Sequence, residues 1–317
     1  MTPVQRGVLA LIIANIIWGF ASPIFKWSLT NISPFTLAFL RFFIAAILFG
    51  IMLRKNLALP IKDKKDLKLL IIHAVTGITG NITFFFLGLQ LTLAMNVPVI
   101  ASSQPIMVFL FAYFFLHEKF KFNKVLGMLI GTIGILGIVL EPIYYKGLDG
   151  NALGNFLIVI ATISGVIGML TGRTIFQKYN PLVLTFWAFV ISAISFLPPA
   201  IAENIQNPTL LASLDIRGIV GIIFGSVFSS ALAYGLFAYG LSKIQASEAS
   251  LFIYIDPIAG TILSYFMLHE PITLPFLIGA LLIFAGIFIA EHRIHYHPIH
   301  KLRTKCPDCE TSQSRVK

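Results

Sequence analysis

Long apolar blocks alternate with short polar connectors along almost the entire chain. Each block holds about 20 predominantly apolar residues, the length that a helix needs to cross the hydrocarbon core of a bilayer. A backbone that spans a bilayer must satisfy its own hydrogen bonds, which a helix does within one segment. The pattern therefore predicts an all-α integral membrane protein with ten transmembrane helices. These predicted spans are residues 7–29, 34–53, 68–90, 95–116, 122–140, 152–172, 181–201, 217–241, 247–268 and 274–291.

The composition excludes an ordinary soluble domain. Hydrophobic residues make up 57% of the 317 residues and charged residues only 11%, whereas soluble domains carry about 25% charged residues. The longest connectors, 54–67 and 203–216, leave little chain for a separate soluble domain. We therefore expect most of the outer surface to contact the lipid bilayer.

The formal net charge of +10 is explained by where Lys and Arg fall relative to the predicted membrane. With the N-terminus in the cytoplasm, Lys146 and Arg217 fall on the outside, and the other Lys and Arg residues beyond the hydrocarbon fall on the cytoplasmic side. Cytoplasmic loops carry an excess of Lys and Arg. The pattern predicts a multi-pass protein of the cell membrane, plasma or inner, with both termini cytoplasmic. It calls for no nucleic acid partner.

The two halves of the chain resemble each other. The Pro-x₁₁-His-Glu pattern of residues 105–118 recurs at 257–270, and the stretch 34–49 matches 181–196 at many positions. Five spans per half is an odd number, so we expect the second half to enter the membrane inverted. Inverted repeats suit alternating access about a central site. The predicted units are a five-span repeat at 1–146, an inverted five-span repeat at 147–292 and a basic cytoplasmic tail at 293–317.

Several of these features together resemble a known family. They are Trp18-Gly19 in the first span, Pro34 and Leu40-Arg41-Phe42 in the second, and the two Pro-x₁₁-His-Glu segments with glycines at 127, 134, 279 and 286. Over about residues 5–291 the sequence is similar to EamA-type members of the drug/metabolite transporter superfamily. The resemblance implies ten helices in two repeats and the export of amino acids or other small metabolites. It leaves the substrate open.

Two ionisable residues inside predicted spans are the main binding candidates, because charge within the hydrocarbon is costly. Arg41 is expected to face a central cavity and hold a substrate carboxylate; the alternative is a side chain that reaches the outer interface or backbone carbonyls. Asp256 is expected to titrate with protons or to bind a substrate amine. The alternatives are a partner for Arg41 or a cap for the backbone beside Pro257. Together, Arg41 and Asp256 would suit the two ends of a zwitterion.

Further candidates surround the prolines of the fourth and ninth spans. A helix proline removes one backbone hydrogen bond, and we expect Pro98, Pro105 and Pro257 to act as hinges. Polar and aromatic residues near them and in other spans are predicted to bind substrate, with ordinary packing as the alternative. These candidates are Trp18, Asn81, Asn96, Ser102, Ser103, Gln104, Tyr234, Tyr239 and Tyr254. His73 is expected to be a satisfied helix residue.

No metal or cofactor is predicted. The His-Glu pairs at 117–118 and 269–270 are expected at helix ends near the membrane interface, since neither continues as the H-E-x-x-H of a metalloprotease. The tail after residue 292 holds His residues and a Cys-x-x-Cys at 306–309, which are metal-ligand types. The short basic segment is interpreted instead as a tail near anionic lipid.

The sequence predicts a secondary transporter and no enzyme. It would export small metabolites, with amino-acid-like compounds favoured, by alternating access around a central cavity. No nucleotide-binding loop of the G-x-x-x-x-G-K-[ST] type occurs, so a gradient would supply the energy, with protons as the candidate coupling ion. The alternatives are a channel or lipid scramblase, and a membrane-embedded enzyme, which would need paired catalytic groups near one depth.

Overall fold

The computed structural model describes residues 2–54, 57–104, 106–108, 111, 122–146, 150–244 and 249–291. Within these residues every regular element is helical. The α-helices are α1 (Pro3–Ser28), α2 (Pro34–Leu53), α3 (Lys64–Ile72), α4 (Asn81–Leu91), α5 (Asn96–Ala101), α7 (Phe122–Lys146), α8 (Gly150–Phe176), α9 (Pro181–Gln206), α10 (Ile216–Ile223), α11 (Ala233–Lys243), α13 (Ile255–Leu268) and α14 (Leu274–Glu291).

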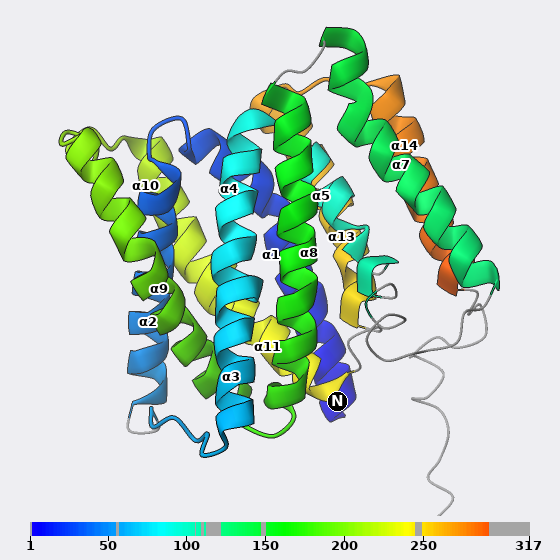
Figure 1. The fold of residues 1–317 in the computed structure, drawn as a ribbon. Coiled ribbons are helices and arrows are strands. Elements are labelled where there is room, and N and C mark those ends of the chain that lie inside the picture. The colour runs from blue at the N-terminus through cyan, green and yellow to red at the C-terminus, as the bar shows by residue number, and fades with distance from the viewer. Residues whose placement is uncertain are drawn as a thin grey trace, which may run out of the picture.

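The helices form a bundle in which chain-distant elements lie side by side (Figure 1). Helices α2 and α9 pack together at one edge, and α7 and α14 pack together at the other. Helix α1 packs against α11 and α13, while α8 packs against α4. The N-terminus and the connector from α2 to α3 lie at the same end of the bundle.

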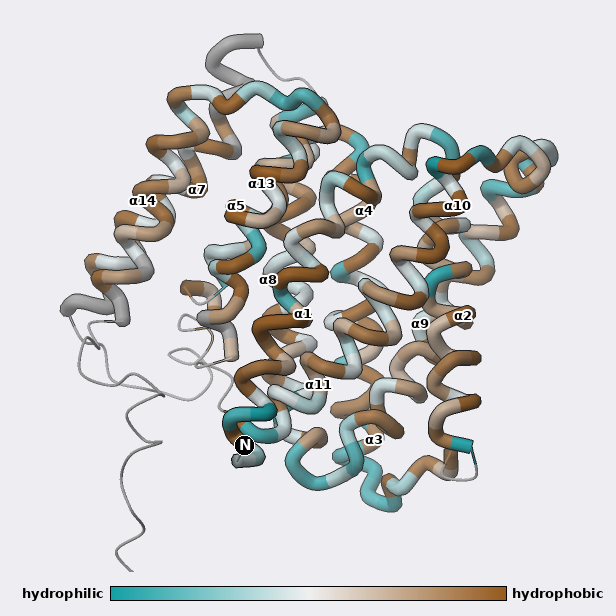
Figure 2. The backbone as a smooth tube through the Cα atoms, turned by 180° about the vertical axis from the view of Figure 1, so that it is seen from behind, coloured by the Kyte–Doolittle hydropathy of each residue, from teal (hydrophilic) through white to brown (hydrophobic). Residues whose placement is uncertain are grey.

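The surface and the helix lengths are those of a membrane protein. Six helical stretches of the described chain are long and apolar enough to cross a membrane, and three apolar helices are shorter. Large apolar side chains face outwards, among them Ile51, Ile205 and Phe266, each at least 66% exposed. Figure 2 shows apolar residues along the helices and the most polar segments near the two ends of the bundle.

Proline and a polar cap start two of the long helices. Pro34 and Pro181 occupy the first turns of α2 and α9. A proline suits this position, because the first helical N–H groups have no partner within the helix. The side chain of Asn180 accepts a hydrogen bond from the Leu182 N–H, as an N-cap does. These local signals explain why the predicted starts at 34 and 181 agree with the structure.

The third and eighth spans contain a π-helical segment each. Segment η1 (His73–Gly80) separates α3 from α4, and η2 (Phe224–Leu232) separates α10 from α11. The two segments occupy equivalent positions in the two halves at the 152-residue offset. π-Helical turns are rare and frequently occur at functional sites.

The fourth and ninth spans, in which the sequence places interrupting prolines, are not continuous α-helices in the structure. Helix α5 ends at Ala101 and a turn follows at Ser102–Ser103. In the ninth span a 3₁₀ segment, η3 (Ser250–Tyr254), precedes α13. Prolines lie beside both interruptions in the sequence and cannot donate the backbone hydrogen bond of a regular helix. Pro105 itself and residues 112–121 lie outside the described residues.

Candidate functional site

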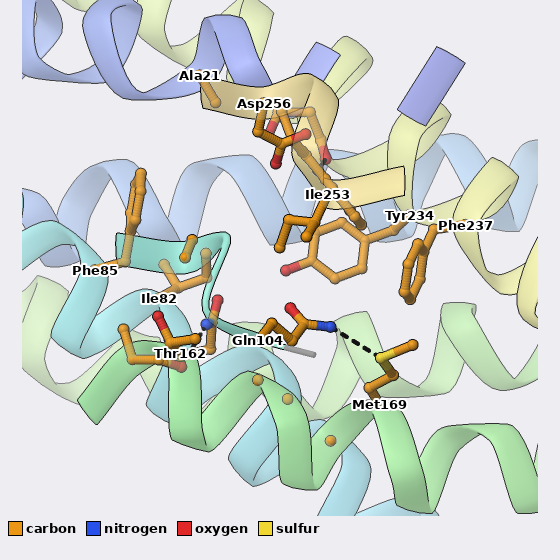
Figure 3. Close-up of a pocket in the computed structure, with 18 of the residues that line it drawn as sticks. Ala21, Ile82, Phe85, Gln104, Thr162, Met169, Tyr234, Phe237, Ile253 and Asp256 are labelled. Atoms are coloured by element: carbon orange, nitrogen blue, oxygen red, sulfur yellow. Dashed lines mark hydrogen bonds between the residues drawn. The ribbon is translucent and has the colours of Figure 1, made fainter. Parts of the chain in front are cut away.

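A central cavity of about 200 Å³ lies inside the bundle (Figure 3). Helices α1, α2, α4, α5, α8, α9, α11 and α13 all supply lining side chains, together with both π segments and η3. In the close-up, Asp256 and Tyr234 approach from one side and Gln104, Thr162 and Met169 from the other. The cavity is therefore shared between the two halves of the chain.

Arg41 lines this cavity from α2 and is only 1% exposed. Its Nε donates to the Ser230 hydroxyl at 2.9 Å and its Nη2 to the Ser229 hydroxyl at 3.1 Å. The guanidinium carbon lies 4.9 and 4.7 Å from the ring centroids of Phe25 and Phe42, within cation–π range. This burial rules out a side chain that reaches the outer interface.

One donor of Arg41 has no partner. Among the buried polar atoms of the described residues, Nη1 of Arg41 makes no hydrogen bond. An unmade hydrogen bond in a buried charged group is costly, so an acceptor that enters the cavity would be favoured at this atom.

Asp256 lines the same cavity from the first turn of α13 and is 7% exposed. Its Oδ1 atom is buried and makes no hydrogen bond to any described residue. The hypothesis that Asp256 pairs with Arg41 is wrong, since the ion pairs of the described chain are Lys178–Asp66 and Arg217–Asp215. Two Arg41 donors bond to the serines of η2 instead, so Arg41 and Asp256 line one cavity without pairing with each other.

Aromatic side chains form one wall. The Trp18 ring lies 5.1 Å from the Tyr234 ring and 5.0 Å from the Phe237 ring, centroid to centroid. The indole Nε1 of Trp18 donates to the backbone carbonyl of Ser229 at 3.0 Å, so α1 is fixed to η2. These rings give the cavity an apolar surface beside its charged groups.

The opposite wall comes from η1, α4 and α8. The Nδ1 atom of His73 lies 2.7 Å from the carbonyl oxygen of Gly168, and the His73 ring packs edge-on against Phe176. Asn81 donates to the Ala161 carbonyl at 2.8 Å. A Cβ on Gly168 would stand 2.0 Å from the Cα of Gly77, so the close approach of η1 to α8 requires glycine there. His73 is satisfied, as the sequence predicts, and it also lines the cavity.

The other sequence candidates divide into two groups. Pro98 and Gln104 also line the cavity, and Gln104 donates to the Met169 sulfur at 2.9 Å. Six candidates do not line it in the structure, and Pro105 is not described. Those six are Asn96, Ser102, Ser103, Tyr239, Tyr254 and Pro257.

Five of these six residues make other contacts in the structure. Ser102 and Ser103 each donate at 2.6 Å to a carbonyl of the preceding turn, at Val99 and Ile100 respectively. Asn96 bonds to Thr92 and Asn155. The Tyr239 ring lies under the ammonium of Lys243, and the Tyr254 ring packs against Phe284.

Several lining residues were missed by sequence reasoning. Asn15 and Ser22 of α1 lie seven residues apart, two helical turns, on the side of Trp18. That spacing was a signal that could have identified them. Ser229 lies in a polar Ser-Ser pair within an apolar span, which marked it in the same way. Phe25, Phe85 and Thr162 gave no signal, because such residues are common in membrane helices.

Glu270 lies just after the end of α13, at a helix end as the sequence predicts, but it is buried against the first half of the chain. It is only 6% exposed, and its carboxylate accepts hydrogen bonds from the N–H groups of Ala94 at 2.7 Å and Met95 at 2.9 Å. Burial raises the pKa of the Glu270 carboxyl, while the two amides and Lys26 act in the opposite direction. The pair at 117–118 and the His/Cys tail lie outside the described residues.

Comparison with known proteins identifies the family. The EamA-like transporter family matches this chain twice, at residues 5–140 and 152–291. An uncharacterized transporter of Archaeoglobus fulgidus is 32% identical, covering 90% of this chain and 98% of that protein. The uncharacterized transporter YoaV of Bacillus subtilis is 27% identical, covering 90% and 96%.

A solved crystal structure of another protein has a similar fold, with a TM-score of 0.62 and 17% sequence identity. The match covers 90% of this chain and 97% of that one. The apolar helices and the shared central cavity agree with these family matches. The chain belongs to the EamA-like transporter family of the drug/metabolite transporter superfamily and is a multi-pass membrane transporter.

Proposed function

We propose that this protein is a secondary transporter that exports small amphipathic metabolites, with amino-acid-like zwitterions as the favoured cargo. One observation carries the proposal. One cavity is lined by both Arg41 and Asp256, each of which has a buried polar atom without a hydrogen-bond partner, and by the aromatic rings of Trp18 and Phe237 from α1 and α11. A cargo carboxylate would bind Arg41, a cargo ammonium would bind Asp256, and the aromatic wall would contact the apolar part.

Alternating access is the mechanism that the repeat favours. Two separate family matches, equivalent π segments in the two halves and a cavity lined by both halves support ten spans in two inverted repeats. Repeats at 1–146 and 147–292 would exchange inward-open and outward-open shapes about the fixed site. The Lys and Arg pattern supports cytoplasmic termini in the cell membrane. Protons are the proposed coupling ion, carried by Asp256.

Flux into proteoliposomes tests this function. The purified full-length protein is reconstituted, a panel of radiolabelled amino acids, organic acids and amines is offered under an imposed pH gradient, and internal pH is read with a trapped dye. We expect zwitterions to move faster than the matched acids and amines, with cargo-dependent proton movement. Arg217→Ala is the matched control for Arg41→Ala, since Arg217 pairs with Asp215 away from the cavity. No movement of any panel member under any gradient would overturn the proposal.

A further inference from the structure

Glu270 joins the two halves of the chain at one end of the cavity. It follows α13 in the second half, and its carboxylate holds the backbone N–H groups of Ala94 and Met95 in the first half, at 2.7 and 2.9 Å. The preceding residue, His269, ends α13 in a left-handed conformation with φ 53°. A non-glycine residue in this region is uncommon and held by its surroundings. This turn directs Glu270 back into the protein.

The first-half side of this contact is firmly anchored. The Lys26 ammonium donates to the carbonyls of Leu89, at 2.8 Å, and of Thr92. The Thr92 hydroxyl bonds to the Asn155 side chain of α8, which also donates to the carbonyl of Ile138 in α7 at 3.0 Å. Residues 92–96 are thereby fixed to α1, α7 and α8. Glu270 therefore attaches the segment after α13 to a rigid support.

The contact between the Lys26 ammonium and backbone carbonyls has an equivalent in the second half of the chain. Arg173 corresponds to Lys26 at the 147-residue offset, and its Nε donates to the carbonyl of Ile244 at 3.2 Å. Each cation contact stays within one half. The Glu270 contact crosses between the halves, as the Thr92–Asn155 hydrogen bond also does, and it joins the ends of α5 and α13.

Both elements that Glu270 holds together line the cavity. Helix α5 begins just after Met95 and supplies Pro98 and Ala101, while α13 supplies Asp256. A Cβ on Gly260 of α13 would stand 2.7 Å from the Pro98 Cγ, so α5 and α13 are in direct contact. Separation of their ends beside Glu270 would open a route between them from this face.

We propose that Glu270 is a latch that closes this end of the cavity by holding the Ala94 and Met95 amides and releases them to water when this end opens. The inference rests on the alternating access of the proposed function. The face is the one that the Lys and Arg pattern assigns to the outside. Closure satisfies two amides with one buried carboxylate; opening returns the carboxylate and both amides to water. Burial raises the pKa of the Glu270 carboxyl, so desolvation offsets part of the hydrogen bonding, which suits a contact that re-forms in every cycle.

Glu203 supplies a matched control. Its carboxylate accepts hydrogen bonds from the N–H groups of Phe35 at 3.1 Å and Thr36 at 2.7 Å, at the start of α2. The chemistry is the same, and this contact also joins the two halves. However, α2 and α9 pack along their length, with the Phe42 and Phe189 rings 5.5 Å apart, so we expect this pair to move as one unit. Neither Glu203 nor Phe35 lines the central cavity.

Thiol accessibility tests the latch without any cargo. Cys306 and Cys309 are changed to Ser, and Ala21→Cys places one reporter thiol in the cavity wall. The rate of reaction with a charged, membrane-impermeant maleimide is measured in intact cells and in inverted vesicles. We expect Glu270→Ala to raise the rate from the Glu270 face by about tenfold, since two buried amides lose their acceptor in the closed form. The rate from the opposite face should fall.

The variant series decides the interpretation. Glu270→Asp keeps the charge but shortens the side chain, so an intermediate rate is expected, and this milder variant serves if Glu270→Ala does not fold. Glu203→Ala should react at the parent rate. An unchanged rate in well-folded Glu270 variants would overturn the latch, as would an equal rise in Glu203→Ala. If accessibility changes as expected but no cargo moves in liposomes, the latch stands and the proposed cargo transport fails.

Discussion

The surroundings of Arg41 and Asp256 differ although the two groups line one cavity. Arg41 sits in the uninterrupted helix α2 and is held by the Ser229 and Ser230 hydroxyls and by the faces of aromatic rings. Asp256 sits in the first turn of α13, directly after a 3₁₀ segment, and its Oδ1 makes no bond to any described residue. The Arg41 guanidinium is therefore held in place with one unpaired donor, whereas a hydrogen-bond partner for the Asp256 Oδ1 would have to come from a molecule in the cavity.

The largest expected effect comes from removing the fixed charge. Arg41→Ala should weaken binding of a zwitterionic cargo at least about thirtyfold, because a buried charged partner of the cargo carboxylate is lost. Affinity is measured by cargo-induced thermal stabilisation in detergent, using the compound that moves fastest in liposomes. Arg217→Ala should bind normally. Equal binding by Arg41→Ala and the parent protein would show that Arg41 has only a structural role.

Asp256→Asn should have the next largest effect. The change keeps the shape but removes the charge, so binding of cargo with a primary ammonium should fall about tenfold. The deaminated analogue of the same cargo should bind equally to both proteins, which separates the carboxyl role from general damage. Asp215→Asn is the control, since Asn also caps a helix well. Uniform weakening for both cargos would contradict the assignment of the ammonium to Asp256.

Gly19 packs against the Asp256 backbone and Gly225 against the Arg41 Cβ, so substitutions at these glycines compare the packing on the two sides of the cavity. We expect smaller effects here, and on stability only. A Cβ on Gly19 would stand 2.8 Å from the Ala259 Cβ and 3.0 Å from the Asp256 carbonyl oxygen, whereas a Cβ on Gly225 would stand 3.1 Å from the Phe25 ring and 3.3 Å from the Arg41 Cβ. Gly19→Ala should destabilise the protein by about 1–3 kcal/mol, because α13 must shift.

At Gly225 the intrinsic helix preference of Ala, about 0.5–1 kcal/mol, should offset much of the crowding. Thermal unfolding in one detergent ranks the two variants against the parent. If Gly225→Ala unfolds earlier than Gly19→Ala, then the Arg41 side is packed more tightly than the Asp256 side, contrary to the structure.

The smallest effect should come from one hydroxyl. Ser229→Ala removes the acceptor of the Arg41 Nη2 and should weaken cargo binding about fivefold, or about 1 kcal/mol, because Ser230 still holds the Arg41 Nε. Ser226→Ala is the control, because that hydroxyl donates to the Ile222 carbonyl within its own helix. Similar affinity losses in both variants would indicate that the serines act through helix packing and do not position the guanidinium.

The sequence by itself determined the helical membrane architecture and much of its segmentation. Apolar blocks of sufficient length must become helices in a bilayer, and Pro34 and Pro181 mark helix starts through local chemistry alone. Burial of Arg41 and Asp256 followed from the same reasoning, since a charge in a span is tolerated chiefly inside the bundle. The family resemblance rested on motifs that were likewise visible in the chain.

Only the tertiary structure decided which polar groups meet. Arg41 finds its serines 188 and 189 residues away, and the contact depends on how α2 and η2 are rotated about their axes. Ser102 and Ser103 look equally polar in sequence, yet each bonds to its own preceding turn. Glu270 likewise meets amides 175 and 176 residues away. The apolar pattern determines that a segment is helical. The contacts of each side chain depend on how the helices are rotated and placed relative to one another, and packing across the whole bundle fixes that arrangement.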